Sequence, residues 1–233
     1  KMIDKCIHMS DFAFPHLELT AKARMNAGVG IVGLAHYMAK NKKFYSSQEG
    51  KDKIHELAET HSWHVINASL RLGKELGNAP WMGRTKWPDG WLPIDTYNKS
   101  VDEVVTVGLQ RDWEGLRKAI VDNGGIRNSC LVNHMPSESS SKASQTTNSV
   151  YPVRDLTLIK TDASVNTLWA APDGDKLKKW YEFAWDIETK DMIDVYAIIQ
   201  KFTDQSISAD LYRKLIGDET VTTQEMIRDY LRM

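Results

Sequence analysis

The residues with the clearest chemical potential form the stretch Leu131-Val132-Asn133-His134-Met135-Pro136-Ser137-Glu138-Ser139-Ser140-Ser141. A short apolar segment stops at Pro136, and small hydroxyl side chains follow it. If a helix begins after Pro136, its free backbone N–H groups and the hydroxyls form an anion-binding site. If no helix begins there, residues 136–149 are a Ser/Thr-rich flexible linker, which composition alone favours.

A second candidate site is the glycine pattern Gly28-Val29-Gly30-Ile31-Val32-Gly33, which reads as GxGxxG. A dinucleotide-binding loop needs a β-strand directly before the first glycine and an acidic residue about twenty positions later. Residues 20–27 are instead polar and favour a helix, and Glu49 lies in a polar stretch. The sequence therefore favours a Gly-rich entry into an apolar helix, where glycine allows close backbone packing. A nicotinamide dehydrogenase using this loop would require a strand before Gly28.

Histidines and cysteines give little support for a metal site. Three histidines fall on one predicted helix, but only His61 and His64 share a face, and no other ligand stands at a suitable offset. Cys6 and Cys130 lack the spacing of a zinc site and are expected to be buried thiols. Two cysteines in a chain of this size indicate a reducing compartment rather than a disulfide-stabilised fold.

Composition limits the classes of protein that the chain can represent. The 233 residues are 42% hydrophobic and 26% charged, which is typical of a globular protein with a substantial core. A net charge of -1 and the lack of a long Lys/Arg block argue against nucleic-acid binding. No apolar run is long enough to span a membrane, and charged residues interrupt any signal-peptide core near the start. The chain opens at Lys1 and reaches Met233 inside a helical pattern, so we expect a piece of a larger protein.

Hydrophobic periodicity predicts long helices separated by short strands and loops. Residues 1–24 are predicted to form a helix followed by a loop at Phe14-Pro15. Further helices are predicted over residues 31–39, 53–76 ending at Gly77, 112–121, from Asp173 or Asp175 to Trp185, 191–202, and after the capping box Thr222–Glu225. The predicted strands cover residues 156–160 and 206–211. Trp81, Trp87 and Trp91 predict an ordered loop, because exposed indoles would be unfavourable. This alternation is typical of an α/β or α-rich α+β protein.

Five segments together resemble the large, catalytic subunit of class I ribonucleotide reductase. In order, they are residues 29–35 (Val-Gly-Ile-Val-Gly-Leu-Ala), 92–97 (Leu-Pro-Ile-Asp-Thr-Tyr), 113–116 (Trp-Glu-Gly-Leu) with 125–129 (Gly-Ile-Arg-Asn-Ser), 135–141 (Met-Pro-Ser-Glu-Ser-Ser-Ser) and 202–209 (Phe-Thr-Asp-Gln-Ser-Ile-Ser-Ala). Their order and spacing match the family across nearly the whole chain, and their residues are most similar to those of bacterial and phage versions. The double glycine Gly124-Gly125 departs from the family pattern and is interpreted as a loop change.

The resemblance implies a fold and a binding site. The family fold is a ten-stranded α/β barrel made of two five-stranded parallel halves, and residues 1–233 resemble a single partial domain, the helix-rich C-terminal half. The resemblance implies that Pro136, Ser137, Glu138, Ser139 and Ser140 match the family's substrate-diphosphate loop at a helix N-terminus. The helix dipole would contribute about 0.3–1 kcal/mol there if exposed and up to about 2 if partly buried. Lys142 is expected to face solvent.

Several parts of the family's machinery are missing from the chain. The radical motif is Asn-x-Cys-x-Glu, and Val132 stands where Asn128-Ser129-Cys130 would require the Glu, so Cys130 is not expected to be the radical cysteine. The redox cysteine pair, the effector-binding N-terminal region, the radical-transfer tyrosine pair and the C-terminal dithiol tail are not found in the sequence. We therefore expect no catalytic residue and no bound cofactor or metal in this chain.

The resemblance also implies partners. They are the N-terminal part of the large subunit, a radical-generating dimetal small subunit, a dithiol reductant and a ribonucleoside diphosphate substrate. The expected location is the cytoplasm, or the host's cytoplasm if the chain is encoded by a phage. The chain alone is expected to be inactive. A non-catalytic assembly fragment with a vestigial phosphate site is the alternative.

Overall fold

The structure is a computed structural model that describes residues 1–162 and 165–233. The α-helices are α1 (Met2–Met9), α2 (Pro15–Arg24), α3 (Leu34–Lys40), α4 (Gln48–Leu76), α5 (Trp113–Asp122), α6 (Glu138–Ala143), α7 (Gly174–Leu177), α8 (Thr189–Gln200) and α9 (Thr223–Arg232). Short 3-10 helices are η1 (Met82–Arg84), η2 (Pro93–Asp95), η3 (Lys99–Val104) and η4 (Lys178–Trp180). Strands β1 (Thr157–Asp162) and β2 (Val165–Ala170) pair antiparallel. Across the described residues, no helix is long and apolar enough to cross a membrane.

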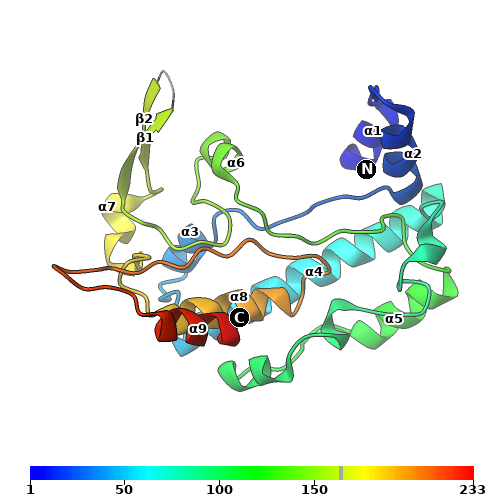
Figure 1. Ribbon diagram of the computed structural model, residues 1–233. Helices are drawn as coiled ribbons and strands as arrows, with labels where there is room; N and C mark the ends of the chain where they lie inside the picture. Colours follow the sequence, from blue (N-terminus) through cyan, green and yellow to red (C-terminus); the bar gives the residue numbers. More distant parts are fainter. Residues whose placement is uncertain (163–164) are drawn as a thin grey trace.

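The long helix α4 forms the axis of the molecule, and α8 packs along it (Figure 1). Ser47 caps its start by accepting a hydrogen bond from the Gly50 amide, and Gly77, with φ of 83°, ends it. The helix therefore begins five residues before its predicted start and ends where the sequence indicates. Its apolar stripe is buried in two clusters, so burial of this face stabilises its position.

Three extended segments run parallel to one another above α4 (Figure 1). The Val29 amide donates to the Leu131 carbonyl at 2.7 Å, and the Ser208 amide donates to the His134 carbonyl at 2.9 Å. The segment around residues 130–134 therefore lies between residues 27–31 and residues 203–208. The resemblance to the reductase family implies a parallel half-barrel. Within the described ranges, however, parallel pairing is limited to isolated bridges, and the only regular sheet is the antiparallel β1–β2 hairpin.

The tryptophan-rich loop is ordered, as predicted. Trp87 is 2% exposed, and its indole N–H donates to the Ser129 carbonyl at 3.0 Å. Trp91 packs against the same core and contacts Trp87 edge to face, with ring centroids 5.5 Å apart. The loop therefore supports residues 126–132 from below, which fixes the start of the middle extended segment.

The predicted helix ending at Trp185 is wrong. Only α7 and η4 are helical, and residues after Trp180 leave the helical path. The Ala184 amide donates to the Val153 carbonyl at 2.7 Å, and Phe183 forms a parallel bridge with Val153. Long-range backbone hydrogen bonding therefore replaces the helical bonds that the apolar stripe predicted.

Two other predicted elements differ from the structure. The predicted strand over residues 206–211 is reduced to a bridge at Ile207, and tyrosine hydroxyls bind nearby carbonyls: Tyr151 donates to Ser208 and Tyr196 to Asp210. The predicted break before Pro15 is present, but a second helix, α2, begins at Pro15 itself, where the missing N–H removes no helical bond.

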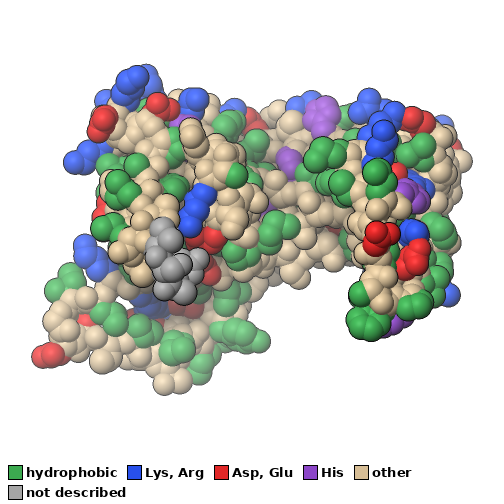
Figure 2. Space-filling view, turned by 90° about the horizontal axis from the view of Figure 1, so that it is seen from above, with side chains coloured by type: hydrophobic (Ala, Val, Ile, Leu, Met, Phe, Trp, Pro, Cys, Tyr) green, Lys and Arg blue, Asp and Glu red, His purple; other side chains and the backbone are tan. Residues whose placement is uncertain are grey.

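The N-terminal helices and the β hairpin lie at opposite ends of the molecule (Figures 1 and 2). Both ends carry apolar side chains that are more than half exposed, including Phe14 and Leu19 at one end and Ile159 and Leu168 at the other. Single exposed apolar side chains are common on protein surfaces, whereas several gathered on one projecting element are less usual.

Candidate functional site

The middle extended segment is fixed to its neighbours by the carboxylate of Asp204. This carboxylate accepts hydrogen bonds from the Leu131 amide at 3.0 Å and from the Val132 amide at 2.5 Å. Burial raises the pKa of Asp204, although the same two amides oppose the rise. This side chain adds to the backbone bonds, in which the Gln205 amide donates to the Val132 carbonyl at 3.2 Å, and positions the chain four residues before Pro136.

The glycines of the GxGxxG pattern allow residues 28–33 to approach this segment. A Cβ on Gly30 would lie 2.5 Å from the Asn133 carbonyl oxygen, and one on Gly33, with φ of 85°, would lie 2.3 Å from the Thr146 hydroxyl. The element before these glycines is helix α2, not a strand. The packing interpretation is therefore confirmed, and the arrangement that a nicotinamide dehydrogenase requires is absent from these described residues.

A helix begins directly after Pro136, so the flexible-linker interpretation is wrong. Ser137 precedes α6, and its amide donates to the Asn148 side-chain oxygen at 2.7 Å. The Ser137 hydroxyl donates to the Met135 carbonyl at 3.2 Å. Ser137, Ser141 and Thr147 are buried, which a flexible linker could not achieve. The polar groups of this stretch are therefore used largely for internal hydrogen bonds.

Ser139 and Ser140 are the parts of the predicted loop that remain available. Both are exposed in the first turn of α6, where helix geometry leaves backbone N–H groups without intrahelical partners. Within the described part of the chain, neither their amides nor their hydroxyls donate to a protein group. Pro136 has no N–H, and Ser137 has committed its own, so these two serines supply the donors that an anion would meet.

Glu138 is held by Asn148 rather than directed into open solvent. The Asn148 side-chain amide donates to the Glu138 carboxylate at 3.2 Å while its oxygen accepts from Ser137. Glu138 also stands in the first helical turn, where a negative charge interacts favourably with the helix dipole. A small cavity of about 80 Å³ lies beside this turn, lined by Glu138, Asn148 and Arg154 among others.

Two histidine rings lie side by side at this segment: His134, which belongs to it and is buried, and His61 of α4, which is partly buried. His134 is 3% exposed, and its Nδ1 accepts a hydrogen bond from the Ile31 amide at 3.1 Å. The ring centroids of His134 and His61 are 5.9 Å apart. Burial, with a smaller contribution from His61, lowers the pKa of His134 to about 4, and burial also lowers the pKa of His61. Both rings are therefore neutral at pH 7 and add no positive charge to the site.

The expectation of two buried thiols is wrong, because Cys6 is exposed on α1 and Cys130 is only partly buried. Cys130 lies in the extended segment and does not have the properties of a reactive thiol. Its carbonyl accepts from the Ala27 amide at 3.0 Å, and burial, followed by the charge of Asp204, raises the pKa of its thiol. A raised pKa keeps the thiol protonated and weakly nucleophilic at neutral pH. Among the described residues, no group of three or more His, Cys, Asp or Glu side chains is arranged to hold a metal ion.

The chain belongs to the family described as "Ribonucleotide reductase, barrel domain", which it matches over residues 1–173 and 161–233. It is 36% identical to ribonucleoside-diphosphate reductase subunit alpha of Buchnera aphidicola subsp. Baizongia pistaciae, covering 99% of this chain and 31% of the relative. The corresponding values are 37%, 86% and 26% for subunit alpha of Escherichia coli reductase 1, and 34%, 91% and 28% for that of Enterobacteria phage T4. The chain thus spans less than a third of the length of these relatives.

Sequence reasoning assigned no supporting role to three residues of the site, although His134 lies in the stretch before Pro136. Asp204 and His134 bind backbone amides 72 and 103 residues away in the chain, and Asn148 binds one eleven residues away. Asp204 falls inside one of the five family-like segments, which was the available signal for it. Asn148 and His134 carried no local pattern, because their partners are set by the tertiary fold.

Proposed function

We propose that this chain is part of the large subunit of a ribonucleoside-diphosphate reductase and forms the side of its active site that holds the substrate's diphosphate. In this proposal, residues 1–233 are a single partial domain, the C-terminal half of the ten-stranded barrel. The observation that carries the proposal is that Ser139 and Ser140, exposed at the start of α6, keep their N–H and hydroxyl donors free of partners among the described residues, directly after an anchored segment.

The anion would be held by uncharged donors. Two backbone N–H groups and two hydroxyls can each donate to phosphate oxygens, and the helix dipole adds a favourable potential. Pro136, Ser137 and Glu138 would shape the turn rather than bind directly, since the Ser137 donors are already engaged.

The whole reductase would convert a ribonucleoside diphosphate to the deoxyribonucleotide, with a radical started by a dimetal small subunit and a dithiol as reductant. Within the described residues, the chain offers no metal-ligand cluster and only a protonated Cys130 near the site. We therefore propose that it is inactive alone, requires the N-terminal part of the large subunit, and acts in the cytoplasm. Reduction of a ribonucleoside diphosphate by the isolated chain would refute this part of the proposal.

The binding role is tested by adding one negative charge at either end of α6. Ser139→Asp places a carboxylate among the proposed phosphate donors, whereas Ala143→Asp places the same group at an exposed position in the last turn of the helix as a matched control. In the complex with the rest of the subunit, we expect Ser139→Asp to weaken ADP binding at least tenfold, equivalent to about 1.4 kcal/mol. Ala143→Asp should leave binding nearly unchanged.

Hydrogen exchange distinguishes the alternative of an assembly fragment with a vestigial phosphate site. If the proposal holds, ADP slows exchange of the Ser139 and Ser140 amides in that complex. Unchanged exchange, together with equal ADP affinity in the two variants, would support the assembly role instead.

A further inference from the structure

Helix α9 is attached to the rest of the molecule by its charged side chains. No residue of α9, all of which the structure describes, is buried, and the apolar residues Ile227 and Leu231 are 53% and 77% exposed. The partly covered residues of α9 are Glu225 and Asp229, and both pair with Arg213. Docking of α9 therefore covers little of its own apolar surface, and the hydrophobic effect contributes little to holding it.

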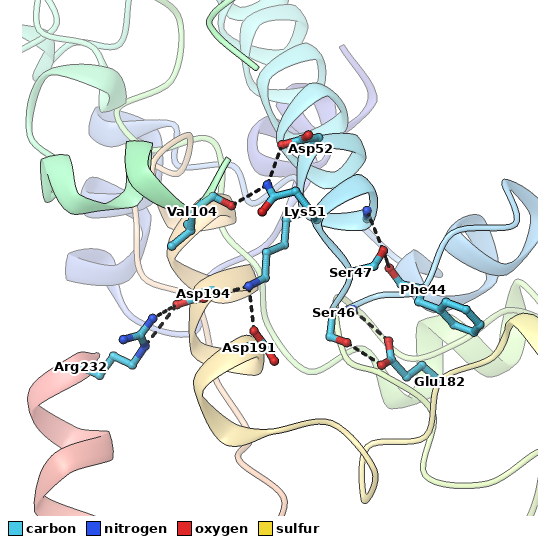
Figure 3. Close-up of polar contacts among 12 residues, drawn as sticks. Phe44, Ser46, Ser47, Lys51, Asp52, Val104, Glu182, Asp191, Asp194 and Arg232 are labelled. Carbon is cyan, nitrogen blue, oxygen red and sulfur yellow. Dashed lines mark hydrogen bonds and ion pairs between the residues drawn. The ribbon is translucent and has the colours of Figure 1, made fainter. Parts of the chain in front are cut away.

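The other attachment of α9 is an ion-pair cluster to which three helices contribute (Figure 3). Arg232 of α9 donates to the Asp194 carboxylate of α8 at 2.5 Å, and Lys51 of α4 donates to the same carboxylate at 2.9 Å. Lys51 also donates to Asp191 of α8 at 2.8 Å. Asp194 and Lys51 are buried, whereas the Arg232 side chain is 41% exposed. Arg232 therefore balances the second carboxylate of the cluster from its solvent-facing side.

The core side of this cluster stays paired without Arg232. Burial alone would lower the pKa of Lys51, but hydrogen bonds to Asp191 and Asp194 raise it above its ordinary value. The Lys51 ammonium group is therefore charged at neutral pH, and it continues to donate to Asp194 when Arg232 leaves. Since a buried carboxylate is costly only when it loses every partner, α9 can detach without disrupting the contact between α4 and α8.

The segment before α9 has the properties of a hinge. Residues 214–221 form neither helix nor strand in the described structure, and most of them are exposed. Gly217 has a φ of 62°, and a Cβ added there would meet no atom within 4 Å. The one long-range ion pair of the segment among the described residues joins Lys214 to Asp186 at 3.7 Å, and both side chains are more than half exposed. Movement of this segment therefore breaks few contacts.

We propose that α9 is a releasable helix, held on α8 by an ionic latch. The latch consists of the Arg232–Asp194 pair and the pairs that Arg213 forms with Asp229 and Glu225. Ion pairs between partly exposed side chains weaken as ionic strength rises, so the latch responds to the surrounding solution as well as to substitution. An isolated helix of ten residues is marginally stable in water, so α9 unfolds when it is released. This inference is independent of the diphosphate-binding role proposed above.

Matched arginine substitutions in the full-length chain test the latch. Arg232→Gln removes the charge that binds Asp194, whereas Arg228→Gln makes the same change at an exposed position one turn earlier in α9. Hydrogen exchange read by mass spectrometry follows the amides of α9 and α8 in each variant. We expect Arg232→Gln to accelerate exchange of α9 at least tenfold with α8 unchanged within threefold. Arg228→Gln should leave both helices within threefold of wild type.

A double-mutant cycle separates release from simple fraying of the helix end. Asp194→Asn removes the same pair without altering α9, and Lys51 keeps its bond to Asp191. It should accelerate α9 as Arg232→Gln does, and the double variant should exchange no faster than either single variant. Fully additive effects would show that Arg232 does not act through Asp194 and would reject the latch.

Ionic strength gives a further readout. Raising NaCl from about 0.1 to 1 M shortens the Debye length from about 10 to 3 Å, and this should accelerate exchange of α9 more in wild type than in Arg232→Gln. Equal exchange of α9 in wild type and Arg232→Gln would overturn the proposal, as would equal acceleration by Arg232→Gln and Arg228→Gln. Acceleration of α8 together with α9 would show that α9 is an integral part of the core and would also reject it.

Discussion

The Asp204 carboxylate offers the sharpest test of how the site is held. In Asp204→Asn, one of the two acceptor oxygens becomes an NH₂ donor facing a backbone amide. The Leu131 or Val132 N–H then loses its partner in a part-buried position. An unsatisfied buried donor costs about 1–3 kcal/mol. This cost is partly offset because burial already disfavours the ionised Asp204 carboxylate, as its raised pKa indicates, and the substitution removes that group.

Native-state hydrogen exchange of the Leu131 and Val132 amides measures this cost locally. A loss of 1–3 kcal/mol in opening free energy accelerates their exchange by about 5- to 150-fold. Asp218→Asn makes the same chemical change at an exposed position and should stay within about 0.5 kcal/mol of wild type. Unaltered exchange at both amides in Asp204→Asn would refute the view that this carboxylate fixes the segment.

The pH dependence of Asp204 provides an independent check with a defined sign. Because its pKa is raised in the folded state, the folded chain binds this proton more tightly than the unfolded chain does. Its contribution to the unfolding free energy therefore decreases as the pH rises from the ordinary aspartate pKa through the folded pKa, and is constant above it. Asp204→Asn should lack this decrease in urea titrations across that range.

Two further predictions concern the packing and the protonation of the same region. Gly30→Ala should destabilise the chain by about 1–3 kcal/mol, since its Cβ would lie 2.5 Å from a backbone oxygen. Gly108→Ala, with open space around its Cβ, should change the thermal midpoint little, and equal midpoints for the two variants would contradict the close approach. Because the pKa of His134 falls to about 4 in the folded state, its contribution to stability is complete above the ordinary histidine pKa and is lost as the pH falls toward 4. The loss in unfolding free energy from this histidine is about 3 kcal/mol between pH 6.5 and 4. In urea titrations, the unfolding free energy of His134→Leu should therefore fall less steeply with decreasing pH than that of the wild type, and equal slopes would reject a lowered pKa for His134.

Local sequence was sufficient for elements whose determinants are close together in the chain. The apolar stripe and Gly77 located α4, and the Thr222–Glu225 capping box located the start of α9. The order of five short segments also identified the reductase family, because residue identities and their order can be compared without knowing the fold. Pro136 and the following serines predicted a helix start, and α6 begins there.

Only the tertiary structure decided which groups at that helix start remain free. Asn148 engages the Ser137 amide from eleven residues away, and Asp204 holds Val132 from 72 residues away. Such partners depend on how distant segments meet, which no local pattern encodes. The same reason explains the lost helix after Trp180, where Val153 binds the Ala184 amide. It also explains α9: its sequence predicts an amphipathic helix, but ion pairs to α8 determine that the apolar side points outward.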